Sequence, residues 1–198
     1  MKNKVWQGNK EKHLSKNPIV RFVDNKLKKE IIKIIKNKEV KTMLDVGCGE
    51  GFITTKIAEA FPEIKIIAID PEKQYIDYAK KFNSLPNIKF KKDKLENIKE
   101  KFDLVISTEV LEHLENPYEM LATMIKLSKK YVLFSVPNEP FFRLGNLLSL
   151  KYVSRFGNTP GHINNWTKNR LRKFVFKTGL KYKIKTSSFW NIVLINVK

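Results

Sequence analysis

Two carboxylates and an imidazole lie within five residues of one another in TEVLEHLENP, residues 108–117. Glu109, Glu112 and His113 stand at positions i, i+3 and i+4, so a helical segment would place all three side chains on one face. Such a group can bind a divalent metal ion or transfer a proton. It can also be the charged start of a helix, which the helix dipole favours. The surroundings of the stretch must decide among these interpretations.

A second group of residues could hold a nucleotide-like ligand. The run LDVGCGEG, residues 44–51, alternates glycines that let a backbone turn sharply and approach a ligand closely. The helix expected after it would supply unpaired amides and a positive dipole end. Asp70 ends the next apolar run, where a carboxylate can accept both hydroxyls of a ribose. The spacing G-x-G-x-G differs from the dinucleotide fingerprint G-x-G-x-x-G, which disfavours an NAD-linked dehydrogenase.

The hydrophobic pattern predicts the elements that would position these residues. Asn17-Pro18 offers an N-cap and a first-turn proline, and apolar residues at helical spacing predict an amphipathic helix over about 18–38. Apolar runs then alternate with helical patterns, which predicts a parallel sheet with helices on both faces. Strands are expected at 40–46, 64–69, 87–91, 102–107 and 130–136, and helices at 52–61, 72–82 and 117–127.

The last third of the chain breaks this alternation. Residues 137–165 form a long stretch rich in Asn, Gly and Pro and dotted with aromatic residues. Loops of that length in compact domains tend to be functional. Thr167 can cap a helix that runs to Gly179. Apolar residues at 180–186 and 190–197 then predict two strands joined by a turn.

Composition bounds the class of protein. At 198 residues with 42% hydrophobic content, a single globular domain with an ample core is expected. The chain has no run of 18 apolar residues and no apolar stretch of a secretory signal near its start. Cys48 is the one cysteine, so neither an internal disulfide nor a multi-cysteine zinc site is expected. We therefore expect a cytoplasmic protein without a transmembrane segment.

The net charge of +19 is carried by the two ends of the chain. Residues 1–44 carry a net +9 and residues 137–198 a net +11, whereas residues 45–136 carry a net −1. Such flanks can attract nucleic acid, anionic lipid or a phosphorylated substrate. However, 34 of the 39 basic residues are lysines, which recognise phosphate less well than arginines do. The charge is therefore also compatible with a lysine-rich genome composition.

Three runs carry a resemblance to a known family: LDVGCGEG, AIDPE at 68–72 and FDLVISTEVLEHLENP at 102–117. Together they resemble the nucleotide-binding half of class I S-adenosylmethionine-dependent methyltransferases, of the ubiquinone-biosynthesis and methyltransferase type 11 kind. The resemblance covers about residues 40–136. It implies a Rossmann-like, doubly wound α/β sheet of seven strands, mostly parallel with one antiparallel C-terminal strand. It also implies S-adenosylmethionine as the cofactor.

The resemblance assigns cofactor-binding roles residue by residue. Asp45 would hold the methionyl ammonium, directly or through water, and Asp70 would bind the ribose hydroxyls. Asp93, after the third strand, would meet the adenine amino group, with Leu95 beside the ring. Thr108 would border the methionine end, where the methyl group is donated. The remaining cofactor-binding residues are Gly47, Cys48, Gly49, Gly51 and Pro71.

The same resemblance gives the 108–117 stretch two interpretations. Without a metal, His113 or His162, with Glu109 beside them, would form the catalytic group that deprotonates an acceptor hydroxyl. With a metal, the run resembles ubiquinone-biosynthesis O-methyltransferases and small-RNA 3′-terminal 2′-O-methyltransferases, in which a divalent ion polarises acceptor hydroxyls. The candidate ligands would be Glu109, Glu112, His113 and His162. The segment around His162 lacks the second histidine and the acidic residues of the RNA enzymes.

We therefore expect a methyltransferase that methylates an oxygen of a small or lipid-like acceptor by aligned transfer with a histidine base. The alternatives are a metal-assisted RNA 2′-O-methyltransferase and a non-catalytic S-adenosylmethionine-binding regulatory protein. The expected single domain comprises a basic N-terminal helical extension (1–39), a cofactor-binding core (40–136), an acceptor lid (137–166) and a helix with a C-terminal hairpin (167–198). Neither the acceptor nor the oligomeric state follows from the sequence.

Overall fold

The structure, a computed structural model, describes residues 13–139, 141, 161–187 and 189–198. Its strands are β1 (Thr42–Val46), β2 (Lys65–Asp70), β3 (Ile88–Lys92), β4 (Phe102–Thr108), β5 (Ser128–Pro137), β6 (Lys181–Ser187) and β7 (Trp190–Asn196). Its helices are α2 (Pro18–Lys36), α3 (Phe52–Ala60), α4 (Lys73–Phe82), α5 (Pro117–Leu127) and α7 (Lys168–Phe176), with short 3₁₀ helices η1 (Leu95–Asn97) and η2 (Leu111–His113). Every helix and strand expected from the hydrophobic pattern is present. Most of the expected acceptor lid lies outside the described residues.

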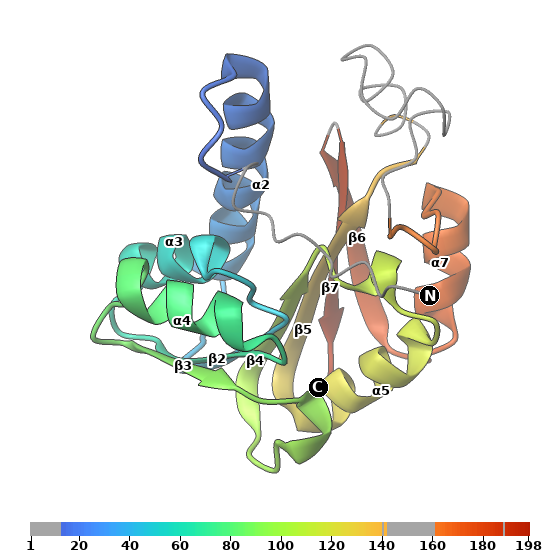
Figure 1. Cartoon of the computed structure of the whole chain (residues 1–198). Coiled ribbons are helices and arrows are strands. Elements are labelled where there is room, and N and C mark those ends of the chain that lie inside the picture. Colours follow the sequence, from blue (N-terminus) through green and yellow to red (C-terminus); the bar gives the residue numbers. More distant parts are fainter. Residues whose placement is uncertain (1–12, 140, 142–160, 188) are drawn as a thin grey trace, which may run out of the picture.

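The strands form one sheet in the order β3-β2-β1-β4-β5-β7-β6. The first five strands are parallel; Leu44 of β1, for example, pairs with Ile67 on one side and Val105 on the other. β7 runs antiparallel to both of its neighbours, β5 and β6. The expected doubly wound α/β sheet with one antiparallel C-terminal strand is therefore confirmed (Figure 1). The strand order reverses between β1 and β4, and ligands bind at the carboxyl ends of the strands at such a point.

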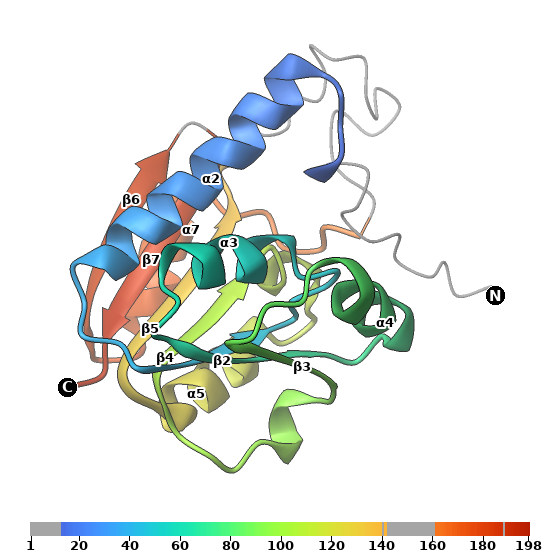
Figure 2. The same cartoon turned by 90° about the vertical axis from the view of Figure 1, so that its left-hand side faces the viewer.

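Helices cover both faces of the sheet, with α2, α3 and α4 on one face and α5 and α7 on the other (Figures 1 and 2). Successive side chains of a strand point to opposite faces. Leu104 and Ile106 of β4 accordingly pack in the core under α2 and α3, whereas Val105 packs with residues of α5 and α7. β4 is buried along all but its last residue, which explains the apolar run Leu104–Ile106 at its centre. None of the described helices combines the length and the apolar character needed to cross a membrane.

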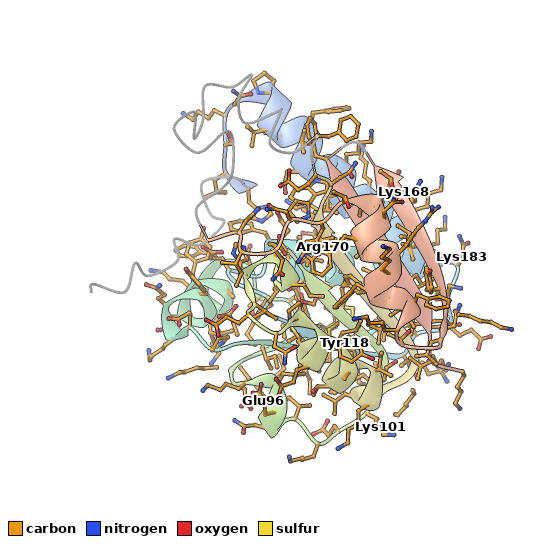
Figure 3. The ribbon with its side chains drawn as sticks, turned by 90° about the vertical axis from the view of Figure 1, so that its right-hand side faces the viewer. Glu96, Lys101, Tyr118, Lys168, Arg170 and Lys183 are labelled. Carbon is orange, nitrogen blue, oxygen red and sulfur yellow. The ribbon has the colours of Figure 1, made fainter. Side chains whose placement is uncertain are left out.

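Basic side chains of the C-terminal part lie on α7 and β6. Figure 3 shows Lys168 and Arg170 on α7 and Lys183 on β6, with Tyr118 on the neighbouring helix α5. Strand β6 is an edge of the sheet, and exposed lysines alternate along it at positions 181, 183 and 185. Lysines on an edge strand oppose pairing with the strands of another chain. Part of the positive charge thus has a structural reason that requires no anionic partner.

Gly51, the residue before α3, lets the loop after β1 lie against the side chain of Phe90 in β3. Gly51 has a φ angle of +83°, and a Cβ atom added to it would lie 2.7 Å from Cζ of Phe90 and 3.3 Å from Cβ of Ala79. The position therefore requires glycine for two reasons, the backbone conformation and the absence of space. The sequence motif at residues 44–51 is in part a packing requirement between α3, α4 and β3.

We expect Gly51→Ala to lower the free energy of unfolding by about 2–5 kcal/mol. A left-handed backbone costs a residue with a Cβ roughly 1–2 kcal/mol, and overpacking against Phe90 adds about 1–3 kcal/mol. The matched control is Gly179→Ala after α7, where φ is +68° but an added Cβ meets no atom within 4 Å. Denaturant unfolding of both variants separates the two costs. Equal losses would show that the contact with Phe90 does not constrain the loop.

Candidate functional site

A cleft of about 260 Å³ opens at the carboxyl ends of β1, β2 and β4. These ends meet because the strand order reverses between β1 and β4. The predicted site residues that line the cleft are Gly47, Cys48, Gly49, Asp70, Pro71, Thr108, Glu109 and His113. Lining residues that the sequence did not single out are His13, Glu50, Phe52, Ile53, Glu72, Tyr75 and Val110. The glycine loop and the 108–117 stretch therefore face one cavity.

Asp70 braces the glycine loop. The backbone N–H of Gly49 donates to Oδ2 of Asp70 at 2.9 Å, and that of Glu72 donates to Oδ1 at 2.9 Å. The N–H groups of Gly47 and Cys48 both donate to the carbonyl of Ile69, at 2.9 and 3.0 Å. Burial raises the pKa of Asp70, although the two amide donors oppose that shift. The carboxylate thus holds the loop in place at the position where a ribose is expected.

Asp45 lies beneath the loop and is 1% exposed. Thr54 Oγ1 donates to its Oδ2 at 2.6 Å, while Oδ1 is buried without a hydrogen-bond partner in the described part of the chain. Burial raises the pKa of Asp45 to about 7; the bond from Thr54 opposes the shift, and the charge of Asp70 adds to it. A buried carboxylate oxygen of this kind needs a cation or a bridging water. Oδ1 of Asp45 could therefore hold a cation, although Asp45 itself is not part of the cleft lining in the described residues.

Four of the predicted cofactor residues, Asp45, Gly51, Asp93 and Leu95, lie outside the cleft lining found in the described residues. The carboxylate of Asp93 accepts from Nδ2 of Asn97 at 2.9 Å and from the N–H of Lys94 at 2.8 Å, and both bonds lower its pKa. Its backbone N–H donates to the carbonyl of Asp70 at 3.2 Å. Asp93 is thus next to Asp70, and its carboxylate is engaged by Lys94 and Asn97. Its contact with adenine stays a prediction.

Cys48 offers its backbone rather than its thiol. Burial raises the pKa of the thiol well above its usual range, and the charges of Asp45 and Asp70 add to the effect. A thiolate, and not a thiol, is the nucleophilic form of cysteine. Cys48 is therefore a small filler of the loop.

The 108–117 stretch is not a single helix, so the condition under which Glu109, Glu112 and His113 would share one helical face is not met. Glu109 has a φ angle of 58°, residues 111–113 form only the short η2, and α5 begins at Pro117. The physical reason is local. A proline disfavours helical backbone in the residue before it, and Asn116 accepts from the N–H of Glu119 as an N-cap.

Hydrogen bonds to backbone carbonyls bring His162 close to His113. The N–H groups of Ile163 and Asn164 both donate to the carbonyl of Glu112 at 3.0 Å, and Nδ2 of Asn164 donates to the carbonyl of Leu114 at 2.6 Å. The rings of His113 and His162 then lie edge to face with centroids 5.0 Å apart. The proximity implied by the family resemblance is therefore present, although nothing in the sequence indicated the role of Asn164.

Two further contacts determine the tautomer of His113 and hold the two ends of the segment 137–166 together. Nδ1 of His113 lies 2.9 Å from the carbonyl oxygen of Gly161, which can only accept, so Nδ1 carries the proton. Burial lowers the pKa of His113, although the bond to Gly161 and the charge of Glu109 oppose the shift. The neutral ring therefore has its lone pair on Nε2. The N–H of Glu139 donates to the carbonyl of Trp166 at 3.1 Å, which brings the two ends of the lid segment together.

Three groups could hold a metal ion: Glu112, His113 and His162 each offer a ligand atom, and these atoms lie within 4.8 Å of one another. Carboxylate and imidazole donors suit Mn, Fe, Co or Zn. Glu109, the fourth candidate, is not part of this cluster in the described residues. These donors are of a type that could hold a divalent ion.

The cleft is acidic although the chain is basic. Glu50, Asp70, Glu72 and Glu109 line it, and Asp45 lies underneath. Among the described residues no lysine or arginine lines it, so its basic side chains are His13 and His113. This distribution, in a protein of net charge +19, favours a ligand with positive charge.

Glu109 carries backbone strain at the cleft. It is the one described residue other than glycine with a positive φ, and it is 8% exposed. Strain of this kind concentrates at functional sites.

We expect the Glu109→Gly variant to have a free energy of unfolding about 1–2 kcal/mol higher than that of Glu109→Ala. Both variants lack the carboxylate, but only glycine adopts the positive φ without strain. Denaturant unfolding of the pair measures the difference. Equal stabilities would mean that the position is unstrained.

Comparison with known proteins agrees with this geometry. Residues 37–168 match a family model described as a methyltransferase domain. The malonyl-[acyl-carrier protein] O-methyltransferase of Halalkalibacterium halodurans is 29% identical over 131 residues, 58% of this chain and 48% of that protein. The ubiquinone biosynthesis O-methyltransferase of Rickettsia bellii is 37% identical over 92 residues, 44% of this chain and 37% of that protein. The chain thus spans about half the length of the curated relatives it matches, or less.

A solved structure is similar over most of the chain. The magnesium protoporphyrin IX methyltransferase of Synechocystis PCC 6803 with bound SAH superposes with a TM-score of 0.72 and 16% identity, covering 94% of this chain and 91% of that one. At this identity the likeness shows the fold alone.

Proposed function

Because the chain belongs to the methyltransferase-domain family, we propose that it is an S-adenosylmethionine-dependent methyltransferase. The observation that carries the proposal is the acidic cleft at the carboxyl ends of β1, β2 and β4. Bound there, the cofactor would supply a methyl group already activated by a positively charged sulfur, next to a cationic ammonium. In this proposal the buried Oδ1 of Asp45 would accept the ammonium and the carboxylate of Asp70, which holds the glycine loop, would accept the ribose hydroxyls.

His113 is the base in this proposal. Its Nδ1 donates to Gly161, so Nε2 takes the proton of an acceptor hydroxyl. The lowered pKa keeps the ring neutral near pH 7, and the charge of Glu109 stabilises the imidazolium once it forms. An acceptor oxygen next to Thr108 would then face the donated methyl. Two relatives carry O-methyltransferase in their names, which supports oxygen of a small or lipid-like acceptor as the target.

A second candidate is a metal-assisted O-methyltransferase, favoured by the cluster of Glu112, His113 and His162. In that role Nε2 of His113 would be a metal ligand and not a base. A divalent ion held there would polarise the acceptor oxygen and lower its pKa. The sequence-based alternative of an RNA acceptor belongs to this second candidate.

Cofactor binding tests the proposal through Asp45. We expect the affinity for S-adenosylhomocysteine to fall about tenfold from pH 8 to pH 6, because the ammonium pairs with ionised Asp45. Burial raises the pKa of Asp45 to about 7, so its ionised fraction decreases over this range. Calorimetric titration at several pH values measures the effect.

Two variants accompany that titration. Asp45→Asn should bind more weakly at pH 8 and show no such pH dependence, and Asp70→Ala should lose binding. A wild-type affinity that does not change with pH would refute the role of Asp45. An absence of cofactor binding altogether would refute the proposed function.

The rate of methyl transfer distinguishes a histidine base from a metal-assisted mechanism. We expect His113→Ala to keep cofactor affinity and to lose roughly a hundredfold or more in methyl transfer, because a general base contributes on that order. Transfer of a labelled methyl group to a panel of small and lipid-like hydroxyl and carboxyl compounds measures it. With a histidine base, a chelator leaves the rate unchanged and His162→Ala has a small effect. A rate that requires Mg, Mn or Zn and is lost in His162→Ala would favour the second candidate.

A further inference from the structure

We propose that His13, held by an ion cluster on α2, binds the carboxylate of the methionyl end of the cofactor, so that α2 forms part of the cofactor site. The inference rests on the proposed function. It concerns a residue that lies outside the matched region 37–168.

An ion cluster fixes the imidazole of His13. Nδ1 of His13 lies 2.8 Å from Oδ1 of Asp24, and Nζ of Lys28, one helical turn later, lies 2.5 Å from Oδ2 of the same carboxylate. The three side chains are 5%, 4% and 11% exposed. Buried ion clusters stabilise a fold weakly or not at all, because the charges lose their hydration. This one therefore calls for a functional reason.

The cluster brings His13 to the cleft. The described chain before α2 folds back from the helix toward α3 and α4 (Figure 2). The ring of His13 lies against that of Phe52, with centroids 4.7 Å apart and planes 31° apart. Phe52 is the first residue of α3 and follows the glycine loop directly. His13 thus lines the same cleft as the glycine loop, which it reaches through Phe52.

The charges of the cleft lining indicate which group of the cofactor His13 would bind. The cofactor carries one anionic group, its carboxylate, and a buried carboxylate needs a cation or hydrogen-bond donors. The cleft lining otherwise contributes four carboxylates of its own, so it would repel that group. Of its two basic side chains, His113 is fixed by Gly161 on the acceptor side. His13 remains: its Nδ1 pairs with Asp24, whose other carboxylate oxygen pairs with Lys28.

The experiment compares two ligands that differ in the amino-acid end. S-adenosylhomocysteine has the carboxylate, and 5′-methylthioadenosine lacks the amino-acid portion but keeps the adenosine and the sulfur. We expect His13→Phe, which keeps a ring against Phe52, to bind the first ligand roughly tenfold to a hundredfold more weakly. Its affinity for the second ligand should be unchanged. Calorimetry gives both affinities.

The control is Leu14→Ala, the next residue, whose side chain is 54% exposed and which should bind both ligands as the wild type does. If His13→Phe does not fold, Asp24→Asn provides the same comparison, since it removes the charge that holds the imidazole. Equal weakening of both ligands would overturn the inference in favour of a packing role. Unchanged affinities with lost turnover would also overturn it and move His13 to the acceptor side. A wild-type protein that binds neither ligand would overturn the proposed function as well.

Discussion

The close approach of Gly47 to Val110 is the constraint on which the site depends. A Cβ atom on Gly47 would lie 2.6 Å from Cγ2 of Val110, so the loop after β1 is pressed against the turn after β4. One of these segments forms the floor of the cofactor cleft, and the other carries Glu109 and His113. The proposed methyl transfer would require the nucleophile, the methyl carbon and the sulfur to be aligned. The contact between Gly47 and Val110 would help to hold the two sides of the cleft in the relative position that this alignment needs.

Hydrogen bonds then attach the remaining parts to this pair of segments. Asp70 holds the loop to the end of β2, and Asn164 fastens the chain before α7 to the turn after β4. Their partners are backbone groups, which can neither titrate nor change rotamer. The cleft is therefore built on backbone segments that hydrogen bonds hold in place. Its negative charge comes from the carboxylates that these segments position.

The sequence predicted the sheet and the glycine loop at the end of its first strand well, for a physical reason. Strands buried on both faces read as continuous apolar runs, and a close backbone approach requires glycine, so both leave a local signal. The spacing of Glu109, Glu112 and His113 alone could not show whether the 108–117 stretch is helical. Asn116-Pro117 marks the start of α5, in agreement with the helix expected at 117–127.

Other parts of the site could not be predicted from the sequence. Asn164 acts through backbone carbonyls of a distant turn, and such bonds impose no periodicity on the residues that receive them. His13 depends on the burial of Asp24 and Lys28, which in the sequence look like ordinary charges on the polar face of a helix. Both are tertiary contacts between segments that carry no motif of their own.

The bond between Glu139 and Trp166 has a consequence for how such a protein can diversify. The chain leaves the end of β5 and returns to α7 at neighbouring points, so the two ends of the intervening segment are held independently of what lies between them. The entropic cost of closing a loop grows only with the logarithm of its length. Insertions, deletions or an exchanged segment at this place would leave the cleft intact. Proteins that share this sheet could thus acquire new acceptors by replacement of the segment between these two points.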